Sequence, residues 1–216
     1  SKLLCRQLLS AVRHMHERGI CHRDIKLQNI LLDKAAGRKS QIKLIDFGYG
    51  SRFIGVCPMT TNCGTPYTTA PEVLRKSYDE RCDIWSIGVV LFIMLSGTRP
   101  FPKVDIPGAL KEAGKTAMIT NILAGRWQFI PRHWNHVTKN AQEFVQKLLH
   151  PIYKERLYAH EAMDLPWIRE RTDKNAKIVE ASIRLTSHYG TEKMPETMNN
   201  TNGFGQFVRE MSIKMN

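Results

Sequence analysis

Two stretches decide the fold of this chain: His22-Arg23-Asp24-Ile25-Lys26-Leu27-Gln28-Asn29 and Ile42-Lys43-Leu44-Ile45-Asp46-Phe47-Gly48. Between them lie an apolar run at residues 30–32 and a polar, glycine-containing turn at residues 33–40. Two short strands joined by a turn predict an antiparallel hairpin, whose open end brings Asn29 beside Asp46. Amide and carboxylate oxygens suit Mg²⁺, and Asp24 lies five residues before Asn29. The sequence therefore predicts a cluster of oxygen ligands at one end of a hairpin.

These motifs resemble the catalytic loop and the DFG motif of eukaryotic protein kinases. The resemblance implies that Asp24 accepts the proton of the substrate hydroxyl and that Lys26 lies near the transferred phosphoryl group. Asn29 and Asp46 would hold the Mg²⁺ ions that bridge the phosphates of ATP. Lysine at position 26 is similar to the branch of the family that is specific for Ser and Thr. A solvated loop before a hairpin would explain any one of these residues, but it explains the whole set poorly.

Residues 49–62 show no regular spacing of apolar residues and contain two glycines and a proline, which indicates a loop. In a kinase this loop would be the activation segment. The resemblance implies that Arg23 pairs with a phosphate on it and orders it. Thr60 and Thr61 are the candidate acceptors for an upstream kinase, with Thr61 at the favoured position. The alternative is that both are unmodified loop threonines.

The stretch CGTPYTTAPE, at residues 63–72, is similar to the segment that ends the activation loop in the family. The resemblance implies that Thr65 forms hydrogen bonds near Asp24 and Lys26 and helps to shape the site for Ser or Thr substrates. It also implies a buried ion pair between Glu72 and Arg156. Tyr67 departs from the pattern, because the family usually has its aromatic residue one position later.

The longest apolar run, at residues 84–95, is too short to span a bilayer and contains a serine and a glycine. It predicts a buried helix that ends at residues 96–97. Asp83 would be its N-cap. In the kinase resemblance the same carboxylate holds the backbone of the catalytic loop, and both roles are compatible.

Helical spacing predicts further helices at residues 2–18, around 119–123, at 139–149 and at 159–165. The predicted fold class is protein-kinase-like (α+β), a mainly helical large lobe with a short hairpin at the active site. This lobe would cover residues 1–170. Residues 171–216 would form a tail that is partly helical or disordered. A glycine, aromatic residues and a tryptophan at residues 125–134 are similar to the calcium/calmodulin-dependent kinase group.

Only 21 residues precede His22, and they contain no G-x-G-x-x-G motif. In the family, that motif and the lysine and glutamate that act with it belong to a small β lobe upstream of the catalytic loop. We expect that lobe to be absent from this sequence, and the isolated chain to have little or no activity. The chain would then represent part of a Ser/Thr kinase that uses ATP and Mg²⁺. The alternative is a non-catalytic, kinase-like binding or regulatory module.

Composition limits the other function classes. The five cysteines show no C-x-x-C spacing, which favours free thiols in a reducing compartment over disulfides or a zinc site. The net charge is +12, but no basic segment is interleaved with aromatic residues, so we expect no nucleic-acid partner. No signal peptide or membrane span is evident, and we expect a cytoplasmic protein, with the nucleus as the alternative. A surface or disordered tail is favoured over a calmodulin-binding or autoinhibitory helix.

Overall fold

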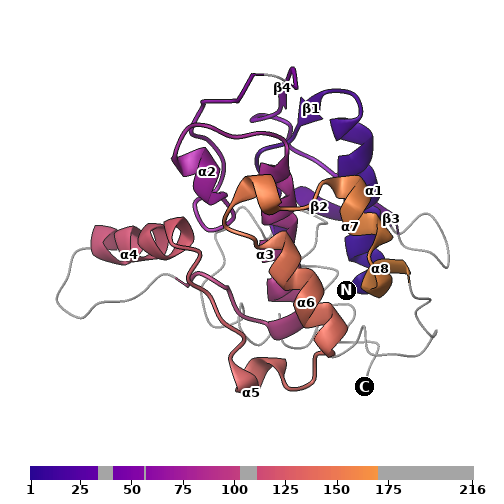
Figure 1. Ribbon diagram of the computed structural model, residues 1–216, viewed down its shortest axis with the longest axis vertical. Coiled ribbons are helices and arrows are strands. Elements are labelled where there is room, and N and C mark those ends of the chain that lie inside the picture. The colour runs from indigo at the N-terminus through magenta and orange to yellow at the C-terminus, as the bar shows by residue number, and fades with distance from the viewer. Residues whose placement is uncertain (34–40, 56, 103–110, 170–216) are drawn as a thin grey trace.

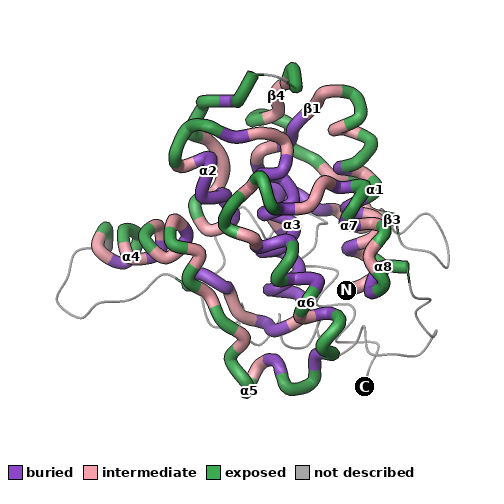
Figure 2. The backbone as a smooth tube through the Cα atoms, viewed as in Figure 1, coloured by how far each residue is buried: buried purple, intermediate pink, exposed green. Residues whose placement is uncertain are grey.

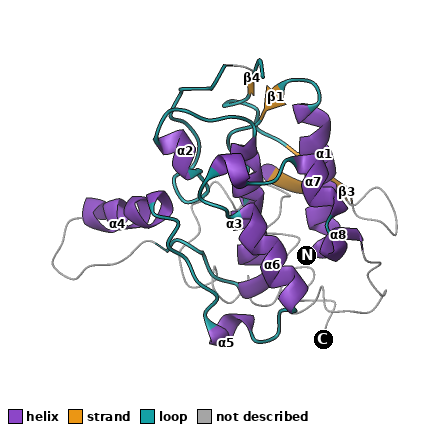
Figure 3. Cartoon of the chain, viewed as in Figure 1, coloured by secondary structure: helices purple, strands orange, loops and turns teal. Residues whose placement is uncertain are grey.

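Helices are the main regular structure in the part of the chain that the computed structural model describes, which is residues 1–33, 41–55, 57–102 and 111–169 (Figure 3). The α-helices are α1 (Lys2–His16), α2 (Pro71–Leu74), α3 (Arg81–Ser96), α4 (Lys111–Leu123), α5 (Pro131–Trp134), α6 (Lys139–Leu148), α7 (Ala159–Asp164) and α8 (Pro166–Arg169). Two 3-10 turns, Leu27–Asn29 and Tyr153–Glu155, add to them. Figure 1 shows α3 in the centre, with α1, α7 and α8 on one side and α4 projecting on the other.

The central helix α3 is buried along almost its entire length (Figure 2). Between Arg81 and Ser96, only Leu95 is partly exposed. Helix α6 packs closely on it, since a Cβ atom added at Gly88 would lie 3.0 Å from the side chain of Leu148. Gly97 ends the helix with a left-handed φ of 73°. The prediction of a buried apolar helix with this end is therefore confirmed.

Helix α1 places an apolar stripe against the core and leads the chain to the catalytic loop. Its buried residues Cys5, Leu8, Leu9 and Val12 follow helical spacing. The helix ends at His16, two residues before the predicted end. Gly19 then turns the chain with a φ of 68°, and its carbonyl accepts a hydrogen bond from the amide of Phe53 at 2.9 Å.

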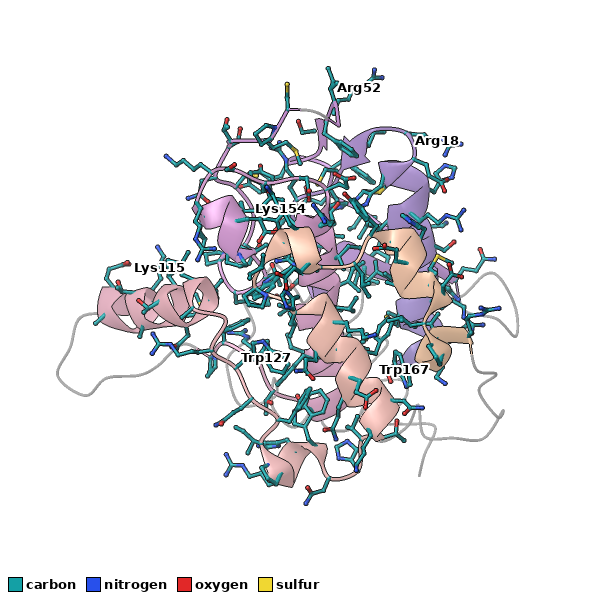
Figure 4. All side chains as sticks on the ribbon, in the orientation of Figure 1. Arg18, Arg52, Lys115, Trp127, Lys154 and Trp167 are labelled. Atoms are coloured by element: carbon teal, nitrogen blue, oxygen red, sulfur yellow. The ribbon has the colours of Figure 1, made fainter. Side chains whose placement is uncertain are left out.

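The predicted hairpin is present and consists of β2 (Ile30–Asp33) and β3 (Gln41–Leu44), paired antiparallel. Ile30 lies opposite Leu44, and the amide of Ile45 donates to the carbonyl of Asn29 at 2.9 Å. A second antiparallel pair, β1 (Ile20–Cys21) with β4 (Ser51–Arg52), was not predicted. Arg18 and Arg52 mark the end of the molecule where this pair lies (Figure 4).

Aromatic side chains fill the space between α3 and the segment that leads to α5. Phe92 of α3 contacts Trp134 with ring centroids 4.6 Å apart, and Phe129 packs on Trp134 at 4.3 Å. Trp127, labelled in Figure 4, lies edge-on to Phe129 at 5.0 Å. Such offset and edge-to-face contacts stabilise the packing beyond the burial of area alone. Trp134 therefore belongs to the hydrophobic core, and Trp127 and Phe129 are partly buried against it.

Two further predictions have different outcomes. The helix predicted at residues 139–149 is present as α6, and Thr138 is its N-cap, although the Thr138 side chain makes no capping hydrogen bond. The predicted tail at residues 171–216 lies outside the described residues. Within the described ranges, no helix is long and apolar enough to cross a membrane. The assignment of residues 1–170 to a large lobe stays a prediction.

Candidate active site

Asp24 is the centre of the candidate site. Its side chain is 1% exposed, and four hydrogen bonds hold its carboxylate. One carboxylate oxygen accepts from the backbone amide of Thr65 at 2.9 Å and from its hydroxyl at 2.7 Å. The other accepts from Lys26 Nζ at 2.7 Å and from the side-chain amide of Asn29 at 3.2 Å. A buried carboxylate with this many donors is fixed in position.

Asp83 holds the backbone of the loop that carries Asp24. One of its oxygens accepts from the amide of Arg23 and the other from the amide of His22, both at 2.8 Å. His16 Nε2 donates to the same carboxylate at 2.9 Å, and Cys21 Sγ donates at 3.3 Å. Burial alone would raise the pKa of Asp83, but the hydrogen bonds from His16 and the two amides outweigh it and lower the pKa. Asp83 is therefore a buried anion that joins α3 to the catalytic loop.

The predicted N-cap role of Asp83 is wrong. Helix α3 begins two residues earlier, at Arg81, and Glu80 is its N-cap. Asp83 thus lies inside the first turn, and its two oxygens serve the amides of residues 22 and 23. The second predicted role, contact with the backbone of the loop, agrees with the structure.

The carboxylate of Asp83 also secures an uncommon backbone conformation. Arg23 has a φ of 67°, in the left-handed region that non-glycine residues rarely adopt. Such a conformation persists where the surrounding contacts over-determine it, and here the amides of both His22 and Arg23 are bound. The turn directs the next residue, Asp24, into the site.

Asn29 and Asp46 lie at the open end of the hairpin, as predicted. Both hydrogen bonds of the Asn29 amide nitrogen go to Asp24, at 2.9 Å to its carbonyl and 3.2 Å to its carboxylate. The amide oxygen of Asn29 is therefore the atom left to act as a ligand. Asp46 is exposed, has a φ of 66°, and accepts one bond from the amide of Gly48 at 3.3 Å. These oxygen donors at one end of the hairpin are of the kind that suits a Mg²⁺ ion.

The segment of residues 63–72 packs against the catalytic loop through a glycine. Gly64 has a φ of 93°, and a Cβ atom there would lie 2.5 Å from the carbonyl oxygen of Arg23. This close approach sets Thr65 beside Asp24 and Lys26, whose Nζ lies 3.0 Å from the Thr65 hydroxyl. The predicted contacts of Thr65 are thus present.

Tyr67, the residue that departs from the family pattern, points toward the catalytic loop. Its hydroxyl donates to the side chain of Gln28 at 3.1 Å, and the guanidinium of Arg99 lies 4.6 Å from its ring centroid. Thr68, where the family usually has the aromatic residue, is buried and donates to the carbonyl of Thr65 at 3.1 Å. The segment therefore keeps its fold by different contacts.

Arg23 and the two candidate phosphorylation sites lie apart from Asp24. Arg23 Nε donates to the carbonyl of Tyr49 at 2.6 Å, and Nη1 donates to the hydroxyl of Tyr78 at 3.1 Å. Thr60 and Thr61 are both exposed on the loop. Tyr78 was missed by the sequence reasoning, because a single tyrosine between polar neighbours carries no periodic signal.

Glu72 and Arg156 form the buried ion pair that was predicted. Arg156 Nη1 donates to one carboxylate oxygen of Glu72, and Nη2 donates to the other at 3.0 Å. The remaining donors of Arg156 bind the carbonyls of His150 and Arg81 at 2.8–3.0 Å. The pair joins α2 to the chain after α6.

All five cysteines lie in the described part of the chain and are free, as expected. The sulfur atoms of Cys21 and Cys82 lie 3.5 Å apart. The atoms of His16, Cys21 and Asp83 that could bind a metal ion lie within 4.8 Å of one another. These groups bind each other and the backbone of the catalytic loop. Their arrangement is accounted for by that structural role.

Comparison with known proteins identifies the family. The protein kinase domain family matches residues 1–168. The chain belongs to the protein kinase family. The kinase chain is 35% identical over 198 residues to a probable myosin light chain kinase of Dictyostelium discoideum, covering 91% of this chain and 48% of that protein.

Other relatives of this kinase have similar identities. Calcium-dependent protein kinase 4 of Plasmodium falciparum is 35% identical over 184 residues, which cover 85% of this chain and 33% of the relative. Human serine/threonine-protein kinase DCLK3 is 34% identical over 167 residues, which cover 77% of this chain and 24% of the relative. The chain thus spans between about a quarter and a half of the length of these relatives. The resemblance to Ser/Thr kinases, including calcium-dependent ones, is confirmed.

Proposed function

We propose that the protein to which this chain belongs transfers the γ-phosphoryl group of ATP to Ser or Thr hydroxyls of protein substrates. The observation that carries the proposal is the Asp24 carboxylate, held by Lys26 and Thr65 at 2.7 Å each and by Asn29 at 3.2 Å. A buried carboxylate with an amino group and a hydroxyl beside it is suited to receiving the proton of a substrate hydroxyl. Because the chain spans only part of its relatives, the activity is proposed for the whole protein.

In this proposal Asp24 orients the substrate hydroxyl and accepts its proton as the oxygen attacks phosphorus. Lys26 Nζ donates to one oxygen of the Asp24 carboxylate, so its positive charge is positioned where the transferred phosphoryl group would pass. Catalysis of this kind depends on positioning and charge stabilisation, with no covalent intermediate on the enzyme. The contacts of Asp24 with four donors supply that positioning before the substrate arrives.

Asn29 and Asp46 are the residues that would hold Mg²⁺. The ion supplies positive charge that neutralises the phosphates of ATP and stabilises the charge that develops during transfer. Asn29 is locked by its two bonds to Asp24, so its oxygen is fixed in direction. The left-handed backbone at Asp46 presents its carboxylate at the end of the hairpin.

Thr65 supports the assignment to Ser and Thr substrates. Its hydroxyl is shared between Asp24 at 2.7 Å and Lys26 at 3.0 Å, so these three groups form one polar cluster at the proposed acceptor position. The names of the relatives, which include Ser/Thr and calcium-dependent kinases, agree with this assignment. Control of the whole protein by calcium, which the name of the Plasmodium falciparum relative states for that protein, is part of the proposal.

The test uses the whole protein and three variants with a Ser/Thr peptide, ATP and Mg²⁺. Asp24→Asn keeps the shape of the side chain but removes the base, and we expect kcat to fall about 100-fold or more. Asp46→Asn should instead weaken the Mg²⁺-dependent binding of ATP. Glu155→Gln, at an exposed position, should match the wild type and controls for general damage. Unchanged kcat in Asp24→Asn would refute the proposed role of Asp24.

A further inference from the structure

Tyr78 connects the catalytic loop to the activation segment through its hydroxyl group. The side chain is fully buried. Its hydroxyl accepts a hydrogen bond from Arg23 Nη1 at 3.1 Å and donates one to the carbonyl of Thr61 at 2.7 Å. One oxygen atom therefore joins the residue that precedes Asp24 to a residue of the segment that carries Thr60 and Thr61.

The backbone of Tyr78 strengthens the same connection. Met59 and Tyr78 form an isolated antiparallel bridge, with N–H···O distances of 2.8 and 3.1 Å in the two directions. Met59 is itself buried among core residues. The stretch from Met59 to Thr61 is thus fixed at both ends by contacts with one residue.

The protonated hydroxyl of Tyr78 can make both of its hydrogen bonds. Burial raises the pKa of Tyr78, and the neighbouring Arg23 only partly opposes this effect. The hydroxyl consequently keeps its proton at neutral pH and can donate it to the carbonyl of Thr61. It also keeps a lone pair for the guanidinium of Arg23.

Arg23 is bound by protein groups at three of its nitrogen atoms in this arrangement. Its Nε binds the carbonyl of Tyr49 at 2.6 Å, its Nη1 binds Tyr78, and its backbone amide binds Asp83 at 2.8 Å. Thr60 and Thr61 are exposed. The segment that carries them leads to Gly64, which packs on the carbonyl of Arg23.

We propose that Tyr78 is a positioning residue that couples Arg23 to the activation segment, so that the site is arranged without a phosphate on Thr60 or Thr61. This inference rests on the proposed function, because it assigns a role within the same site. The hydroxyl of Tyr78 binds Arg23 on one side and the Thr61 backbone on the other. From Thr61 the chain continues through Cys63 and Gly64 to Thr65, which holds Asp24.

The first test measures the order of the segment and does not depend on activity. The Cys63 sulfur is half-buried and lies 4.0 Å from the Tyr78 hydroxyl, whereas Cys57 in the same segment is exposed. In the chain shown by intact mass to carry no phosphate, we expect iodoacetamide to label Cys57 quickly and Cys63 slowly. In Tyr78→Phe, Cys63 should be labelled about fivefold faster. The loss of one hydrogen bond of ordinary strength shifts the opening equilibrium of the segment by about this factor.

Tyr153→Phe is the matched control, because it removes a tyrosine hydroxyl elsewhere in the fold. It should leave both labelling rates unchanged, and Cys57 serves as an internal reference in every variant. An unchanged Cys63 rate in a folded Tyr78→Phe chain would overturn the proposal. So would fast labelling of Cys63 in the unphosphorylated wild type.

The second test uses the whole protein and a double variant, Thr60→Val with Thr61→Val. We expect its phosphoryl-transfer rate to stay within about twofold of the wild type. A fall of tenfold or more would show that a phosphate on this segment is required, and the proposal would be wrong. If the wild type transferred no phosphoryl group, the proposed function would fail, while the labelling of Cys63 would still decide the role of Tyr78.

Discussion

Replacing Arg156 with alanine should destabilise the folded chain more than almost any other single change. The side chain of Arg156 is completely buried, and that of its partner Glu72 is 3% exposed. The substitution leaves the Glu72 carboxylate buried without its cation. It also removes the donors that bind the carbonyls of His150 and Arg81 and the contact with the ring of Trp85 at 5.0 Å.

The magnitude follows from the burial of the pair. Breaking a buried ion pair by removing one partner lowers the free energy of unfolding by about 3–5 kcal/mol. A domain of this size loses roughly 2–4 °C of Tm for each kcal/mol, so the Tm should fall by roughly 6–20 °C. That loss is a large part of a typical total stability of about 5–15 kcal/mol.

Thermal unfolding followed by circular dichroism measures this effect. Arg13→Ala is the matched control, because it breaks the exposed pair between Arg13 and Glu17, whose N–O distance is 2.7 Å. Its Tm should stay within the scatter of repeated measurements. An unchanged Tm in Arg156→Ala would refute the reasoning. It would mean that the Glu72 carboxylate is hydrogen-bonded to another group or to water in the variant.

Two further predictions concern the contacts that hold the catalytic loop. The pKa of Asp83 is lowered in the folded chain, because the hydrogen bonds from His16 and the amides outweigh the effect of burial. Its carboxylate therefore adds stability above the unfolded pKa of about 3.9, and this stability is lost as pH falls through the lower folded pKa. In Asp83→Asn, the unfolding free energy should fall less steeply as pH drops below about 5 than it does in the wild type. Urea denaturation at several pH values measures this slope, and a slope equal to that of the wild type would contradict the prediction. Gly64→Ala should lower the unfolding free energy by about 1–3 kcal/mol, because of its left-handed φ and the close carbonyl of Arg23. Gly55→Ala, where an added Cβ meets nothing within 4 Å, is its control, and equal effects of the two would argue against the close approach.

The hairpin and the main site residues could be predicted because their signals are local. Asn29 and Asp46 flank two short apolar strands, and strand pairing alone makes such flanking residues neighbours. The buried helix α3 follows from the long apolar run at residues 84–95. In each case a few adjacent residues contain the information.

Contacts between distant segments were harder to predict. A carboxylate before an apolar helix has the same local pattern whether it caps that helix or binds another loop, and Asp83 binds amides some 60 positions away. Strands β1 and β4 have two residues each, too few to show alternation. Tyr78 is recognisable only once its hydroxyl is seen between Arg23 and Thr61.

The most direct test of the proposed activity is mass spectrometry of a Ser/Thr peptide incubated with the whole protein, ATP and Mg²⁺. The expected product is the peptide with one phosphoryl group on a Ser or Thr hydroxyl, formed by the wild type and nearly lost with Asp24→Asn. A whole protein that binds ATP and Mg²⁺ but phosphorylates no peptide or protein substrate would contradict the account. That result would favour a non-catalytic binding or regulatory module with a kinase fold.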